Sequence, residues 1–132
     1  MFLLDTNAII HFLHGHTKLT QKLNEHLPVD IKISFVSVGE LIFGAYHSQY
    51  IEKNLLVIHE LCEKIEVIHS TISTATTYGK LKNLSLQKRK FPGDHDLWIA
   101  ATALEKKATL ITQNTKHFSW IEELKVTDWT KS

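Results

Sequence analysis

The sequence has little of several residue types, and each shortage excludes a class of protein. Cys62 is the only cysteine among 132 residues, which excludes an internal disulfide and favours a reducing, cytoplasmic environment. Two prolines and five glycines leave no linker, repeat or low-complexity run. No apolar stretch is long enough to span a membrane, and no basic segment precedes an apolar one at the N-terminus, so we expect neither membrane attachment nor a signal peptide.

The net charge of the chain excludes fewer classes of protein than these shortages do. The formal net charge is +1, which is compatible with either a nucleic acid or a protein as partner. Arg89 is the only arginine, so bidentate reading of bases by arginine cannot be the main recognition device. Lys88, Arg89 and Lys90 end the basic stretch "KLKNLSLQKRKF". These three residues are candidates for RNA binding, and the alternative is a solvated helix end.

Short apolar runs alternate with helical patterns along the whole chain, whose length suits one domain over residues 1–132. We expect strands at residues 1–5, 31–38, 65–68, 108–112 and 124–129. We expect helices at residues 6–13, 37–49, 50–64, 71–89 and 94–104. This alternation predicts βαβ units, and therefore an α/β fold with a small, mostly parallel sheet and helices on both faces.

Two aspartates stand at the start of the apolar segment "FPGDHDLWIAATAL", residues 91–104. Asp94 follows Pro92-Gly93, which favours a role as helix N-cap. Asp96 would lie in the first helical turn, beside a face that repeats apolar residues at Leu97, Ala100, Ala101 and Leu104. A carboxylate so close to a core normally has a partner. His95 lies between the aspartates and is either a surface residue or a contact to substrate phosphate.

Several other polar residues follow the predicted strands and should meet Asp96 at one edge of the sheet, because ligands bind beyond the carboxyl ends of parallel strands. They are Asp5, Ser37, Glu40, Thr112 and Asn114, and Asp94 is expected there beside Asp96. Each has a structural alternative. Thr6 or Asn7 could cap the first helix, Ser37 and Glu40 fit a capping box, and Asn114 could cap a short turn.

Three carboxylates from distant segments, Asp5, Glu40 and Asp96, would repel one another unless something neutralised them. An oxygen-rich acidic cluster suits a hard divalent cation, Mg²⁺ or Mn²⁺. Other chemistries have less support. The chain has no glycine-rich phosphate-binding loop, Cys62 has the surroundings of a core residue, and the histidines of "HFLHGH" lack the second ligand pair typical of structural zinc.

Five segments in this order resemble the PIN-domain ribonucleases, and among them the VapC-type toxins of bacterial type II toxin–antitoxin modules. They are "LLDTN", "SVGELIFGA", "GDHDLWIAATAL", "LITQNTKHF" and "VTDW". The resemblance implies a three-layer PIN-like domain in which Asp5, Glu40 and Asp96 hold Mg²⁺ or Mn²⁺ and are catalytic. It implies supporting roles for Thr6, Asn7, Thr112 and Asn114, with Asp94 as a cap or outer group. Asn114 stands where many PIN domains carry a fourth acid, which puts a second metal in doubt.

The resemblance also implies an endoribonuclease that hydrolyses a structured RNA such as a tRNA and is neutralised by a VapB-like antitoxin. The apolar region from Glu40 to Leu61, with Phe43 and Tyr46, is then the expected antitoxin surface and a candidate surface for a homodimer. The alternative is a module of the same fold that binds RNA or protein without cleaving it.

Overall fold

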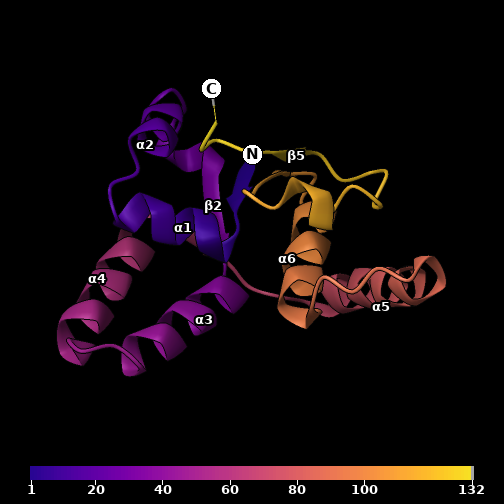
Figure 1. The fold of residues 1–132 in the computed structure, drawn as a ribbon, viewed down its shortest axis with the longest axis horizontal. Helices are drawn as coiled ribbons and strands as arrows, with labels where there is room; N and C mark the ends of the chain where they lie inside the picture. The colour runs from indigo at the N-terminus through magenta and orange to yellow at the C-terminus, as the bar shows by residue number, and fades with distance from the viewer. Residues whose placement is uncertain (132) are drawn as a thin grey trace.

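The computed structural model describes residues 1–131, which form five strands and six α-helices (Figure 1). The strands are β1 Phe2–Leu4, β2 Ile31–Ser34, β3 Glu66–Ile68, β4 Thr109–Ile111 and β5 Val126–Thr127. The helices are α1 Thr6–Leu13, α2 Thr17–Asn24, α3 Phe35–Tyr46, α4 Ile51–Lys64, α5 Ile72–Lys88 and α6 Asp94–Glu105. Two short 3₁₀ helices are η1 Pro28–Asp30 and η2 Thr115–His117.

The strands form one parallel sheet in the order β3-β2-β1-β4-β5. The chain moves outward from β1 to β2 and β3, and then returns to the other side of β1 for β4 and β5. Strand order therefore reverses between β1 and β4. The carboxyl ends of these two strands are where a parallel α/β sheet offers a ligand site.

The two faces of the sheet have separate cores because successive side chains of a strand point to opposite sides. Leu3 and Leu110 belong to the core that α5 and α6 cover. Leu4 and Ile111, one residue further along each strand, belong to the core that α1, α2, α3 and α4 cover. Figure 1 shows α5 and α6 together on one side and the first four helices on the other. The predicted parallel α/β fold with three layers is confirmed.

The element boundaries differ from the prediction in one consequential place. The stretch predicted as strand through residue 38 becomes helical at Phe35, and Ser34 caps α3 by accepting a hydrogen bond from the Val36 N–H at 3.1 Å. Ser37 lies inside the helix, so the capping box predicted for Ser37 and Glu40 is wrong. Helix α2 was not expected. No helix among residues 1–131 is long and apolar enough to cross a membrane.

Candidate active site

Asp5 leaves β1 directly into α1, and the fold fixes its carboxylate on both sides. Its Oδ1 accepts a hydrogen bond from the Ala8 N–H at 2.8 Å, so Asp5 is the N-cap of α1, and the predicted cap by Thr6 or Asn7 is wrong. Its own N–H donates to the Ile111 carbonyl at 3.0 Å, which joins the ends of β1 and β4. The residue is only 4% exposed. Burial raises the pKa of Asp5, hydrogen bonds from Thr112 and Ala8 oppose the rise, and the charge of Glu40 adds to it.

Glu40 lies in the middle of α3 and is held by a residue of α1. The Thr6 hydroxyl donates to Glu40 Oε1 at 2.6 Å, and Thr6 Oγ1 also lies 3.0 Å from Oγ of the fully buried Ser37. On the other side, His95 Nδ1 lies 3.1 Å from Glu40 Oε2. Both oxygens of the Glu40 carboxylate therefore have a contact: Thr6, in α1 just after β1, contacts Oε1, and His95, at the start of α6, contacts Oε2.

Asp96 lies in the first turn of α6, with its side chain 34% exposed. Burial raises the pKa of Asp96, and the negative charges of Asp5 and Glu40 raise it further. His117 and His95 oppose this rise, with His117 Nδ1 at 4.0 Å from Asp96 Oδ2. The structure therefore brings Asp5, Glu40 and Asp96 within range of one another's charge at the carboxyl edge of β1.

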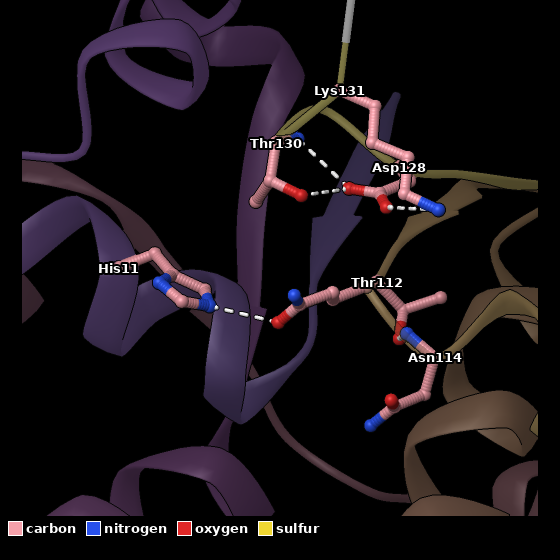
Figure 2. Close-up of polar contacts among 7 residues, drawn as sticks. His11, Thr112, Asn114, Asp128, Thr130 and Lys131 are labelled. Atoms are coloured by element: carbon pink, nitrogen blue, oxygen red, sulfur yellow. Dashed lines mark hydrogen bonds and ion pairs between the residues drawn. The ribbon is translucent and has the colours of Figure 1, made fainter.

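The segment after β4 also lies at the carboxyl edge of the sheet, and Figure 2 shows two of its residues, Thr112 and Asn114. Thr112 is almost fully buried, forms a hydrogen bond with Asp5 and accepts one from the Asn114 N–H at 3.0 Å. The Asn114 side chain makes no capping bond to η2, so the predicted cap is wrong. His11 of α1 reaches across to Gln113 Oε1 at 3.0 Å, which ties this segment to α1. Asn7 is exposed and lines a groove beside the site.

Asp94 does not cap α6, and it lines the same cleft as Glu40 and Asp96. Gly93, with a φ of 101°, occupies the cap position, and Asp94 is the first helical residue. Its Oδ1 accepts hydrogen bonds from Lys82 Nζ at 2.8 Å and from the Tyr78 hydroxyl at 3.0 Å. Lys82 and Tyr78 lower the pKa of this carboxyl. Asp94 therefore joins α6 to α5.

The three basic residues that were predicted to bind RNA have different surroundings. Lys88 Nζ donates to the Trp120 carbonyl at 3.2 Å. Arg89 ends α5 in a left-handed conformation with a φ of 55°. Lys90 is exposed and lies beside η2, at the wall of a pocket.

Glu40 lies where three hollows meet. A cleft of about 330 Å³ is lined by Glu40, Asp96 and the turn from Pro92 to His95. A groove of about 800 Å³ runs from Thr6, Glu40 and His95 to the aromatic side chains of Phe35, Phe43 and Trp98. A third hollow of about 390 Å³ is lined by residues of α1, α3 and α4.

The side chains expected at the antitoxin surface divide into two sets. Leu41 and Ile58 belong to the core. Phe43 and Tyr46, in contrast, are 65% and 60% exposed. The apolar surface beside the acidic site is therefore real and open to solvent.

The donor set agrees in chemistry with a hard divalent cation. Asp5, Glu40 and Asp96 offer only carboxylate oxygens, and their mutual repulsion is what a bound cation would relieve. Within residues 1–131, no three histidine, cysteine, aspartate or glutamate side chains form a closed ligand set as they stand. Each oxygen of Glu40 has one contact, to Thr6 or to His95, and keeps a lone pair that could serve a cation.

Two residues of the site were not found from the sequence. His117 in η2 lies with Nδ1 4.0 Å from Asp96 Oδ2 and, with His95, opposes the rise in the pKa of Asp96. Its only sequence signal was its position just beyond β4. Tyr78 of α5 stacks on Trp98 of α6 with ring centroids 4.0 Å apart and planes 4° from parallel. Nothing local in the sequence pairs these two rings.

Comparison with known proteins agrees with this architecture. Residues 2–123 match the PIN domain. The chain is 39% identical to the protein named Ribonuclease VapC1 from Haemophilus influenzae strain R2866, over 99% of both chains. It is 30% identical to the tRNA(fMet)-specific endonuclease VapC from Shigella flexneri, over 98% of both chains. The solved structure of VapBC-1 from nontypeable Haemophilus influenzae superposes with a TM-score of 0.89 at 36% identity, over 98% of both chains.

The fold and the site define a class of protein: a parallel α/β domain with acidic residues where the strand order reverses, between β1 and β4. The chain belongs to the PIN-domain family and, within it, to the VapC ribonucleases.

Proposed function

We propose that this protein is a divalent-metal-dependent endoribonuclease and the toxin of a toxin–antitoxin pair. The observation that carries the proposal is the shared electrostatic site of Asp5, Glu40 and Asp96, in which burial and mutual repulsion raise the pKa of both aspartates. Three mutually repelling carboxylates at one edge of a sheet cost stability, and a bound cation would relieve that cost. The names of the VapC relatives support ribonuclease activity.

Each residue has a role that follows from its position. Asp5, held rigidly by the Ala8 and Ile111 backbone, and Asp96, at the start of α6, would hold the cation together with Glu40. Thr6 orients Glu40, and Thr112 orients Asp5. His95 and His117 lie at the rim, 3.1 Å and 4.0 Å from carboxylate oxygens, where each could donate to a phosphate oxygen.

The bound cation, Mg²⁺ or Mn²⁺, supplies charge neutralisation at the phosphate and a more acidic water. Attack by water in line with the 3′-oxygen would break the P–O3′ bond, so the products would carry a 3′-hydroxyl and a 5′-phosphate, and the ribose 2′-hydroxyl would take no part. Asn114 brings no charge to this edge, so it would not add to the negative charge of Asp5, Glu40 and Asp96.

The substrate class we propose is a structured RNA cleaved in an exposed single strand, such as a tRNA loop. Unpaired bases there can be turned outward and reach a shallow site. The name of the Shigella flexneri relative, a tRNA(fMet)-specific endonuclease, supports a tRNA for this chain too.

The partner we propose is a VapB-like antitoxin that packs on the exposed aromatic side chains of α3, Phe43 and Tyr46. The groove from Phe43 to Glu40 leads an occupant directly to the acidic site. A basic side chain delivered there would pair with the carboxylates in place of the cation. The VapBC-1 structure from Haemophilus influenzae, with its TM-score of 0.89, supports such a complex, and the same apolar surface is our candidate for a toxin homodimer.

A cleavage panel tests the enzymatic proposal. A tRNA, a single-stranded DNA and a small phosphate ester are each incubated with the protein, with Mg²⁺ or with chelator. We expect cleavage of the tRNA alone, only with the cation, and none by Asp96→Asn, whose folding is verified by circular dichroism. Normal cleavage by Asp96→Asn in excess chelator would sink the metal-nuclease proposal. Binding of RNA without cleavage would favour the non-cleaving module.

A further inference from the structure

A pocket of about 240 Å³ lies next to the acidic cleft and has the opposite electrostatic character. Lys90, Phe91 and Pro92 form one wall, and Lys116, His117 and Trp120 form the other. Pro92 lines both hollows, and His117 Nδ1 lies 4.0 Å from Asp96 Oδ2, so the pocket and the cleft adjoin.

The fold holds both walls in place. Arg89, with its left-handed backbone, ends α5, and the Lys90 N–H donates to the Ser85 carbonyl at 2.8 Å, which turns the chain toward η2. Lys88 Nζ donates to the Trp120 carbonyl at 3.2 Å and links the two walls. The Trp120 indole N–H donates to the His117 carbonyl at 2.7 Å. These bonds fix the backbone around both walls of the pocket.

The groups that face solvent in this pocket suit a nucleic-acid strand. Lys90 and Lys116 are exposed, and within residues 1–131 no salt bridge engages either one. No acidic residue lines the pocket. Phe91 is 73% exposed, which leaves its ring available for stacking. Cations that track a phosphate backbone, next to an aromatic ring that stacks on a base, are the usual means of holding single-stranded nucleic acid.

The larger groove on the other side of Glu40 differs in this respect. Its lining includes the apolar side chains of Ile10, Phe35, Val36, Phe43 and Trp98. Thr6, Asn7, Glu40 and His95 are its polar side chains, and it has no lysine or arginine. A phosphate backbone gains little there, whereas an apolar peptide segment gains much. The two sides of the acidic site thus favour different occupants.

We propose that Lys90, Phe91, Lys116 and His117 form a subsite for the unpaired nucleotide next to the scissile phosphate, with its base on Phe91 and its phosphate held by the two lysines. This inference rests on the proposed ribonuclease function. The RNA then enters or leaves the cleft on the η2 side, and the opposite groove is left for the protein partner.

Binding of a fluorescein-labelled single-stranded RNA to the full chain, followed by anisotropy in chelator over a series of KCl concentrations, tests the subsite. Phe91→Leu should raise Kd by about fivefold, the change that corresponds to about 1 kcal/mol of stacking, while Phe91→Tyr keeps the wild-type Kd. The double variant Lys90→Ala/Lys116→Ala should reduce the slope of log K against log[salt] by about 1.4, or about 0.7 per lost phosphate contact. Lys53→Ala, an exposed lysine on α4, is the matched control and should change neither quantity.

Cleavage of the same RNA with Mg²⁺ separates this inference from the function on which it rests. Salt-sensitive binding that depends on Lys90 and Lys116, without any cleavage, supports the subsite and rejects the nuclease. Cleavage with a wild-type KM by both the double variant and Phe91→Leu overturns the subsite and leaves the nuclease intact. An equal loss of RNA binding in Lys53→Ala overturns it as well, because any surface charge would then have served.

Discussion

Replacing Asp5 separates its two roles, as a helix cap and as a buried charge. Asparagine caps a helix about as well as aspartate, so Asp5→Asn should keep the bond from the Ala8 N–H and lose only the charge. Asp5→Ala loses both. We therefore expect the alanine variant to be about 1 kcal/mol less stable than the asparagine variant, or about 4 °C in Tm for a chain of this length.

The sign of the pH dependence follows from the raised pKa values of Asp5 and Asp96. A raised folded pKa means that ionisation costs stability in the folded state. The cost is absent below the ordinary value of 3.8, grows as pH rises through the folded pKa, and is complete above it. In chelator at neutral pH, Asp5→Asn should therefore be more stable than wild type, and this advantage should vanish toward pH 3.

Metal should reverse this order. Mn²⁺ at about 100 times its Kd stabilises the protein that binds it by about 2.7 kcal/mol, so wild type should overtake Asp5→Asn. Urea unfolding of wild type, Asp5→Asn and Asp5→Ala, followed by circular dichroism in chelator and in Mn²⁺ at two pH values, measures the free energy of unfolding of each protein under each condition. An asparagine variant no more stable than wild type in chelator at neutral pH would refute the charge-relief reasoning. An asparagine variant only as stable as the alanine variant would refute the role of Asp5 as a helix cap. Equal stabilisation of wild type and Asp5→Asn by Mn²⁺ would refute the assignment of Asp5 as a ligand.

Three further predictions concern other parts of the chain. Asn114→Asp should tighten Mn²⁺ binding in calorimetry, because a fourth carboxylate adds charge at the site, and an unchanged affinity would place this residue beyond the reach of the metal. Phe43→Glu should weaken antitoxin binding by about 2 kcal/mol or more. The control Ile72→Glu, at an 84% exposed position on α5, should leave antitoxin binding unchanged. Equal recovery of both variants in a pull-down with the VapB-like partner would show that the partner binds another surface. Lys107→Gly should raise the free energy of unfolding in urea by about 0.5–1 kcal/mol, because Lys107 adopts a φ of 54° that glycine tolerates without strain. A lower free energy of unfolding would show that the lysine side chain contributes more to stability than the backbone strain costs.

The meeting of the polar residues at one edge of the sheet could be predicted from the sequence, because these residues directly follow strands or lie at the starts of helices. Asp5 and Thr112 follow β1 and β4 directly, and Asp96 opens the helix that leads into β4. A parallel sheet places all such positions at one edge, so the convergence requires no knowledge of packing. What each residue does there is still a prediction.

Other features depended on contacts that local sequence does not encode. Phe35 and Val36 have the composition of a strand, yet they begin α3. Helix α2 buries only Leu19 and Leu23, which is too little apolar periodicity to distinguish it from a loop. Asp94 was expected to cap α6, but its carboxylate points to Tyr78 and Lys82, which only the packing of α5 on α6 brings near.

The position of Glu40 at the meeting point of three hollows has a thermodynamic consequence. Any occupant of the apolar groove that draws on this carboxylate competes with the cation for the same oxygens. Linkage then makes the antagonism symmetrical: the factor by which a protein partner weakens cation binding equals the factor by which the cation weakens binding of the partner. In a cell, the fraction of active enzyme would therefore follow the supply of divalent cation as well as the supply of partner, with one side chain transmitting both signals.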